Sequence, residues 1–273
     1  MTSTARILTG GMPWQPPPAR RLAERTLRAA VAGGVQLIDT ADSYALGANE
    51  EFIADILAPY PPELLIATKV GQCRPGPGQW VPLGRPEYLR QQAQLSLRRL
   101  RVDTLDLLQL HRLDPAVPLE DQVGTLAELR DQGLAREVGL SQVTVEELER
   151  ACAITPIAAV QNKYSISHRD DAVLDWCAQR GITFLPWRPL EISDTDAPVL
   201  AEVAAQYNCS TTRVALAWLL HRSPALAPIP GTSRPEHLAD NLGASVLHLD
   251  PVHLTLLDDQ HPPNKQCAQP AAA

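Results

Sequence analysis

The sequence predicts a (β/α)8 barrel, and three observations support this fold class. The chain has 273 residues, close to the ~250 residues that such a barrel typically occupies as one domain. Short β-like runs alternate with helical stretches along nearly the whole chain, and regular alternation of this kind is typical of parallel strands. No linker or shift in composition divides the sequence. Residues 1–273 are therefore expected to form a single barrel domain.

The expected strands recur at regular intervals. A first strand over residues 4–8 is short and weakly patterned, so the N-terminal segment is shortened relative to a full barrel. Seven clearer runs rich in apolar and β-branched residues follow it. These runs cover residues 35–39, 64–70, 104–110, 135–140, 157–160, 182–187 and 226–229.

The helices between these strands carry recognisable start and stop signals. Gly33 and Gly181 end two of them, as glycine commonly does at a helix C-terminus. Pro86 suits a first helical turn, and Thr144 with Glu147 has the spacing of a capping box. The expected helices cover residues 19–32, 49–57, 86–100, 119–131, 145–153, 170–180, 198–207, 211–222, a stretch after Pro235, and 251–260.

Composition excludes several classes of protein. The net charge of −7 argues against a nucleic-acid-binding surface, which needs a basic face. No apolar run approaches the ~20 residues of a membrane helix, and no signal peptide is visible. The five cysteines are widely spaced and odd in number, so neither disulfides nor a metal site is expected. We expect a cytoplasmic protein, a monomer by default, with a disordered tail over residues 266–273.

Four polar residues follow consecutive expected strands, at the barrel end where active sites lie. They are Asp39, Tyr44, Lys69 and His111. Each alone has an ordinary explanation, such as a turn cap, a loop aromatic or a structural histidine. Lys69 stands out because it follows an apolar run and should be partly buried, which lysine avoids unless it is paired. Their joint occurrence indicates an active site.

Several segments, in this order, resemble motifs of one family, the aldo-keto reductase superfamily in its bacterial oxidoreductase-type branch. The resemblance covers roughly residues 20–260. Its motifs are Asp39-Thr40-Ala41 followed by Tyr44, Ala67-Thr68-Lys69, Leu108-Gln109-Leu110-His111, Gly139-Leu140-Ser141, Gln161-Asn162-Lys163-Tyr164, and Pro230-Gly231-Thr232-Ser233-Arg234 completed by Asn241.

The resemblance implies reduction of an aldehyde or ketone by NADPH, and the chemistry of the residues supports it. The nascent alkoxide needs a proton, and a tyrosine with an ordinary pKa near 10 is a poor donor at neutral pH. An ammonium beside it stabilises the phenolate. We therefore expect Tyr44 as general acid, Lys69 as its charged neighbour and Asp39 as the group that orients Lys69. A neutral His111 would orient the carbonyl oxygen.

The resemblance also implies cofactor and substrate residues. NADP(H) is the expected cofactor, with NAD(H) left open, and a small-molecule carbonyl is the expected partner. The residues expected to contact the cofactor are Ser141, Gln142, Gln161, Trp187, Arg188, Thr232, Ser233, Arg234, His237 and Asn241. Trp14 and Trp80 are the candidates for contact with substrate.

Four departures from the family pattern leave two alternatives open. The N-terminus is short, Gln142 replaces an asparagine, and Gly231 and His237 stand where relatives often have Lys and Arg. Glu191 would repel a diphosphate unless it points away or Arg188 offsets its charge. The alternatives are a non-catalytic NADP-binding or regulatory protein, against which the intact set of four argues, and a barrel with a redox-neutral lyase or isomerase activity.

Overall fold

The computed structural model describes residues 6–8 and 17–259. The expected tail over residues 266–273 and the candidate substrate residue Trp14 lie outside the described residues.

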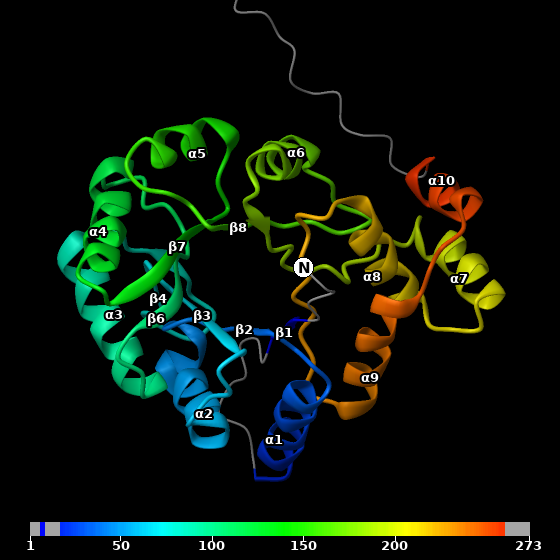
Figure 1. Ribbon diagram of the computed structural model, residues 1–273, viewed down its shortest axis with the longest axis horizontal. Coiled ribbons are helices and arrows are strands. Elements are labelled where there is room, and N and C mark those ends of the chain that lie inside the picture. The colour runs from blue at the N-terminus through cyan, green and yellow to red at the C-terminus, as the bar shows by residue number, and fades with distance from the viewer. Residues whose placement is uncertain (1–5, 9–16, 260–273) are drawn as a thin grey trace, which may run out of the picture.

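A curled sheet of seven parallel strands forms the centre of the molecule, in the order β1-β2-β3-β6-β7-β8-β9 (Figure 1). Six of the expected strands are confirmed within a few residues, including the short first one. The bounds are β1 Arg6–Leu8, β2 Leu37–Asp39, β3 Leu65–Val70, β6 Leu105–Leu110, β7 Ala135–Ser141, β8 Ala159–Gln161 and β9 Thr183–Phe184.

The last two strands are shorter than expected, because prolines interrupt them. The expected strand 182–187 is reduced to β9, since Pro186 has no N–H to donate to the ladder. The expected strand 226–229 is reduced to one parallel bridge between Phe184 and Leu226. Pro228 and Pro230 flank its end and cannot extend the pairing.

Helices surround the sheet on its outer side (Figure 1). The capping box is confirmed, because the Thr144 side chain accepts from the Glu147 amide and the Glu147 side chain accepts from the Thr144 amide. Gly181 ends α6 in the left-handed region, with φ of 69°. The bounds are α1 Pro17–Ala32, α2 Ala48–Leu57, α3 Pro86–Leu100, α4 Leu119–Asp131, α5 Val145–Cys152, α6 Asp171–Arg180, α7 Ala197–Gln206, α8 Thr211–Arg222, α9 Pro235–Gly243 and α10 Pro251–Asp259, with 3₁₀ turns η1 Tyr44–Gly47 and η2 Ala244–Val246.

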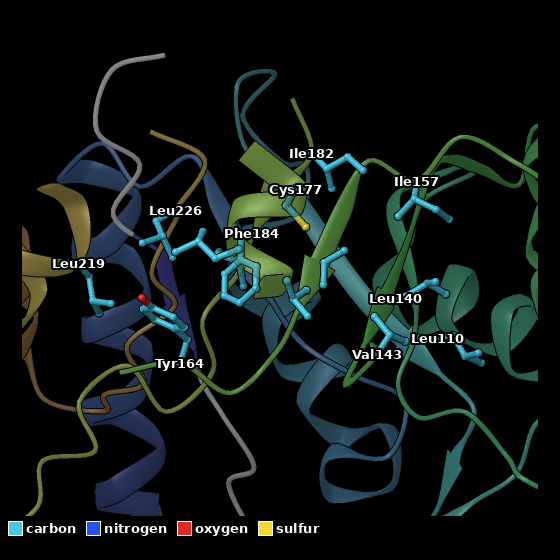
Figure 2. Packing of buried hydrophobic residues seen from close by; sticks show 14 of the residues in the cluster. Leu110, Leu140, Val143, Ile157, Tyr164, Cys177, Ile182, Phe184, Leu219 and Leu226 are labelled. Atoms are coloured by element: carbon cyan, nitrogen blue, oxygen red, sulfur yellow. The ribbon is translucent and has the colours of Figure 1, made fainter. Parts of the chain in front are cut away.

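The core has two main parts, one on each face of the sheet, and a third small cluster joins Ala30, Val35 and Leu238. The larger part packs strand side chains against the helices, and Figure 2 shows some of it around Tyr164 and Phe184. The smaller part joins residues of β2, β3, β6 and β8 with residues of the segments after β9 and α8. Its members are Leu37, Ala67, Leu107, Ala159, Leu185, Ala227 and Ile229.

Polar residues lie directly above this smaller cluster. Side chains two apart on a strand point to the same face. Asp39, Lys69, Gln109 and Gln161 each follow a member of the cluster by two positions. The barrel interior is therefore apolar in one layer and polar in the next, at the carboxyl ends of the strands.

A hairpin that the sequence did not indicate crosses this end of the sheet. Residues 71–85, between the expected strand 64–70 and the expected helix 86–100, contain the antiparallel strands β4 (Gln72–Cys73) and β5 (Val81–Pro82). Trp80 lies immediately before β5. Within the described part of the chain, every helix is too short or too polar to cross a bilayer.

Candidate active site

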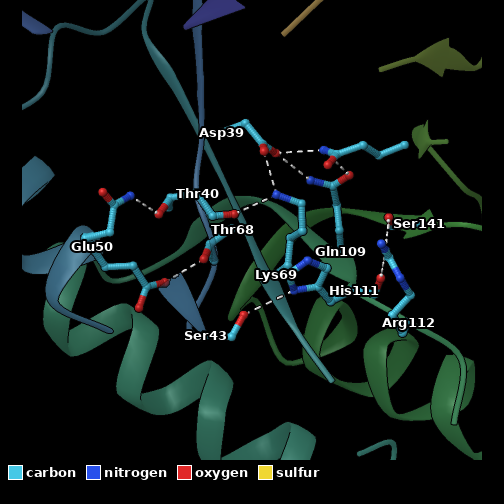
Figure 3. Close-up of polar contacts among 12 residues, drawn as sticks. Asp39, Thr40, Ser43, Glu50, Thr68, Lys69, Gln109, His111, Arg112 and Ser141 are labelled. Atoms are coloured by element: carbon cyan, nitrogen blue, oxygen red, sulfur yellow. Dashed lines mark hydrogen bonds and ion pairs between the residues drawn. The ribbon is translucent and has the colours of Figure 1, made fainter. Parts of the chain in front are cut away.

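A buried ion pair joins the ends of β2 and β3. Lys69 Nζ donates to Asp39 Oδ2 at 2.5 Å and to the Thr40 carbonyl at 2.8 Å (Figure 3). Both side chains of the pair are fully buried. Burial alone would lower the pKa of Lys69, but Asp39 and Tyr44 outweigh it and raise that pKa. Lys69 is therefore a permanent ammonium at neutral pH.

Asp39 also holds two amides from the other strands of the polar layer. Its Oδ1 accepts from Gln161 Nε2 at 2.9 Å and from Gln109 Nε2 at 3.1 Å. The Gln161 amide nitrogen is thus directed at Asp39, which leaves its oxygen as the atom available to a cofactor. The carboxylate is satisfied on both oxygens, as a buried charge must be.

Tyr44 lies against the ammonium of this pair. Lys69 Nζ is 5.2 Å from the centre of the Tyr44 ring. Burial raises the pKa of Tyr44 above its usual value, and the charge of Lys69 opposes that rise. The expected stabilisation of the phenolate is present, but it does not outweigh burial.

His111 faces Tyr44 from the end of β6. The two rings are edge to face, with centres 5.7 Å apart. Burial, then the charges of Lys69 and Arg112, hold the pKa of His111 well below its usual range. The imidazole is therefore neutral, as expected. Ser43 Oγ lies 3.3 Å from His111 Nδ1, so a proton donated by Ser43 leaves Nε2 as the ring donor.

Trp80 completes a group of three rings over the site. Its ring centre is 6.3 Å from that of Tyr44 and 6.4 Å from that of His111, both edge to face. Arg74 stacks on Trp80, with Cζ 3.9 Å from the ring centre. The hairpin thus places this candidate substrate residue next to the catalytic candidates, although its side chain is 42% exposed.

Arg112 belongs to this site, and sequence reasoning missed it. Its Nη1 donates to the His111 carbonyl at 2.6 Å and to Ser141 Oγ at 2.9 Å (Figure 3). Burial lowers the pKa of its guanidinium, and Tyr44 opposes this. The available signal was its position directly after a strand-end histidine.

The residues expected to contact the nicotinamide lie beside Arg112. Ser141 ends β7, and Gln142 follows it with a φ of 56°. Gln142 Oε1 accepts from Trp187 Nε1 at 2.5 Å and from the Lys163 amide at 2.9 Å. The amide of Gln142 thereby fixes the indole of Trp187, another of the residues expected to contact the cofactor.

A cavity of about 480 Å³ continues from Trp187 between two loops, 188–191 and 229–231. Glu191 lines it, but its charge is offset. Lys163 Nζ donates to Glu191 Oε1 at 2.8 Å, and Arg188 Nη1 lies 3.3 Å from Oε2. The two cations leave this corner with a net positive charge, so it fits an anion such as a diphosphate.

The remaining candidates surround the start of α9. Arg234 and His237 are exposed, and the Arg234 amide donates to Thr232 Oγ1 at 3.1 Å. The Ser233 carbonyl accepts from Thr26 Oγ1 at 2.8 Å. Asn241 is buried, and its Oδ1 has no hydrogen-bond partner among the described residues. A helix start that follows an arginine, with an unsatisfied buried acceptor in the last turn of the same helix, fits a phosphorylated nucleotide with an amino group on its base.

The model of the Aldo/keto reductase family matches residues 6–260 of this sequence. This chain belongs to the aldo/keto reductase family. An uncharacterized oxidoreductase of Schizosaccharomyces pombe is 40% identical to the reductase over 259 residues, covering 94% of this chain and 84% of the relative. The pyridoxine 4-dehydrogenase of Escherichia coli is 39% identical over 262 residues, covering 93% and 92%.

Solved structures agree on the fold. A thermostable aldo-keto reductase, crystallised with the inhibitor epalrestat, matches with a TM-score of 0.82 and 29% identity, covering 94% of each chain. The prediction of a (β/α)8 barrel is therefore confirmed, and the reductase is an NAD(P)H-dependent oxidoreductase.

Proposed function

We propose that the reductase converts an aldehyde or ketone to an alcohol with NADPH, and that Tyr44 donates the proton. The observation that supports this most directly is the buried Asp39–Lys69 pair with its ammonium 5.2 Å from the Tyr44 ring centre. A buried charge pair is expensive to build, and here its ammonium faces the side chain whose ionised form that ammonium stabilises. The neutral His111 on the other side of Tyr44 supplies a hydrogen-bond donor.

In this proposal the carbonyl oxygen binds between the Tyr44 hydroxyl and His111 Nε2. The reduced nicotinamide supplies the hydride to the carbonyl carbon when it is bound. The C=O π electrons move to oxygen, and the Tyr44 hydroxyl transfers its proton to that oxygen. Lys69 stabilises the phenolate that remains, and Asp39 keeps Lys69 charged and directed. A proton from solvent then restores Tyr44.

The exposed side chains at the start of α9 support NADP(H) over NAD(H). Arg234 supplies a positive charge and His237 a hydrogen-bonding group where a 2′-phosphate would lie, at the start of a helix. Asn241 Oδ1 would accept from the amino group of adenine. Ser141 and the free oxygen of Gln161 would hold the carboxamide, and Trp187 would stack on the nicotinamide.

Pyridoxal is the first substrate to test. It is the aldehyde that corresponds to the substrate named for the E. coli relative. Its flat ring suits the edges of Tyr44, Trp80 and His111, since aromatic rings pack favourably edge to face. We further propose that the reductase is a cytoplasmic monomer without a nucleic-acid partner. Its four described cysteines are unpaired, as in a reducing compartment.

The decisive experiment is Tyr44→Phe, which removes only the hydroxyl. We expect kcat for pyridoxal reduction to fall by roughly 10²–10⁴-fold, because the general acid is lost. The NADPH dissociation constant, measured by quenching of tryptophan fluorescence, should stay the same. Tyr207→Phe is the matched control, because the Tyr207 hydroxyl bonds only to the Asp250 amide and His253 among the described residues.

The alternatives give different results. Full activity in Tyr44→Phe would overturn the assignment of the acid. Tight NADPH binding without oxidation by any carbonyl in a broad panel would favour a non-catalytic cofactor-binding protein. Failure of the protein to bind NADPH would favour a redox-neutral lyase or isomerase reaction in the same barrel.

A further inference from the structure

The proposed mechanism leaves the charge of Arg112, directly after His111, without a function. Asp39 and Lys69 neutralise each other, and His111 is neutral. Arg112 is half-buried next to them, and no carboxylate pairs with it among the described residues. The site therefore carries a net positive charge at the position after His111.

Arg112 shares this lack of a carboxylate with Arg74, which stacks on Trp80, and it differs from the other described arginines that are similarly withdrawn from solvent. Those others meet carboxylates, because removing a cation from water without a counter-ion is costly. The described examples are Arg99 with Glu50 at 2.6 Å, Arg213 with Asp240 at 3.0 Å, Arg222 with Asp171 at 3.0 Å and Arg169 with Asp258 at 3.3 Å.

The hydrogen bonds of Arg112 leave one edge of its guanidinium open. Both of its described hydrogen bonds use Nη1, which holds the group between the His111 carbonyl and Ser141. Nε and Nη2 make no hydrogen bond to the described residues. These two nitrogens form the side of the guanidinium whose parallel N–H bonds match the two oxygens of a carboxylate.

We propose that Arg112 binds a carboxylate of the substrate, so that the reductase prefers carbonyl compounds that carry this group close to the reacting carbon. This inference rests on the proposed carbonyl reduction. Arg112 directly follows His111, the residue proposed to bind the carbonyl oxygen. The carbonyl and the carboxylate of the substrate should therefore lie a few bonds apart. Arg112 does not take part in proton or hydride transfer. It selects and orients the substrate.

The test compares aldehydes of the same shape that differ in charge. The probes are 2-, 3- and 4-carboxybenzaldehyde, each paired with the corresponding carbamoylbenzaldehyde, in which a neutral amide replaces the carboxylate. For at least one position, kcat/KM should favour the acid by about 10-fold or more. Arg112→Gln should reduce that preference by about 10–100-fold, the range for a charge-assisted hydrogen bond in a protein. Arg112→Lys should retain part of it.

Two measurements separate this role from others. Because Arg112 bonds to Ser141, the NADPH dissociation constant of Arg112→Gln must be measured, and we expect it to be unchanged. Arg180→Gln is the matched control. Arg180 Cζ lies 4.1 Å from the Trp176 ring centre, as Arg112 Cζ lies 5.7 Å from that of Trp187. That variant should keep the full preference for the acid.

Equal turnover of acid and amide by the unmodified reductase at all three positions would overturn the inference, as would an Arg112→Gln variant that loses both activities equally. A measurement of ligand binding tests the inference even if the proposed reaction itself is wrong. Benzoate should then raise the melting temperature of the NADPH complex more than benzamide does, and Arg112→Gln should abolish the difference. An equal effect of the two ligands would overturn the inference independently of turnover.

Discussion

At the scale of single residues, Asp42 is the most unusual group beside Tyr44, the proposed acid. Its side chain is 5% exposed, and neither carboxylate oxygen has a hydrogen-bond partner among the described residues. Burial, reinforced by the charge of Glu50, raises its pKa to about 8. Glu50 differs because its two oxygens accept from Thr68 and Arg99. Asp42 therefore binds a proton in the folded state over a pH range in which the unfolded chain has lost it.

This shift makes the stability of the reductase depend on pH. The folded pKa is about 8 and the unfolded value is 3.8, so the folded state is progressively penalised as pH rises between these values. Asp42→Asn removes the penalty. At about 1.4 kcal/mol per pKa unit, the gain in unfolding free energy has an upper bound of roughly 5 kcal/mol at pH 8, and it should be close to zero at pH 4. Urea unfolding at both pH values measures it. An equal gain in unfolding free energy at pH 4 and pH 8 would contradict this assignment of the pKa shift to Asp42.

At the scale of elements, the turn η1 determines where Tyr44 lies. Ala45 and Leu46 have φ of 50° and 56°, and Gly47 has a φ of 92°. Left-handed conformations cost roughly 1–2 kcal/mol for ordinary L-residues, and they persist where the surroundings hold them. A side chain at position 47 would also meet Arg99, since a Cβ there would lie 2.7 Å from Arg99 Cδ. The reductase thus keeps a strained turn directly after its proposed acid.

Replacing Leu46 with asparagine should relieve part of this strain. Asparagine tolerates the left-handed region, and the Leu46 side chain is 74% exposed, so little packing is lost. We expect Leu46→Asn to raise the unfolding free energy by about 0.5–1 kcal/mol, measured by urea denaturation. Val246 is equally exposed, at 74%, but has no positive φ. The matched variant Val246→Asn should show no gain, and a gain in both would argue against strain at η1.

At the scale of the whole molecule, the two halves of the barrel contribute different parts of the site. Asp39, Tyr44, Lys69 and His111 come from the first half, on or after β2, β3 and β6. The expected cofactor residues come from β7 onward, as far as α9. Tight binding of a cofactor along the second half places its nicotinamide against the first half.

Binding of NADPH should therefore stabilise the molecule as a unit. At a concentration 100 times the dissociation constant, a ligand adds about 2.7 kcal/mol, and each kcal/mol raises the melting temperature of a chain of this size by roughly 2–4 °C. We expect a single calorimetric transition shifted upward by about 5–10 °C. NADH at the same concentration should give a smaller shift. A larger shift with NADH would contradict the assignment of Arg234 and His237 to the 2′-phosphate.

The sequence predicted those parts of the site that depend on local pattern. Strand periodicity placed Asp39, Lys69 and His111 at neighbouring strand ends, and parallel pairing then brings such residues together. The prolines at 186, 228 and 230 were visible as well, but their effect on strand length depends on which N–H groups the neighbouring strand requires.

Other parts could not be predicted, because they depend on contacts between distant segments. The hairpin of β4 and β5 has only two residues in each strand, too few for a pattern of alternation. That hairpin decides whether Trp80 lies in solvent or beside Tyr44. That no carboxylate among the described residues pairs with Arg112 is likewise a property of everything packed around it. No spacing in the sequence encodes such a property.

The contacts of the Asp39 carboxylate limit which substitutions this position can tolerate. It contacts Lys69 of β3, Gln109 of β6 and Gln161 of β8 while belonging to β2 itself. One group thus contacts the polar side chains of three other strands, and Gln161 Nε2 adds a longer hydrogen bond to Gln109 Oε1 at 3.4 Å in the same layer. The same group sets the charge next to the proposed acid. A substitution at position 39 would therefore disturb the arrangement of the strand ends and the charge of the site together. A related protein that has lost the reaction and this residue would need another group to hold the polar layer at the carboxyl ends of the strands.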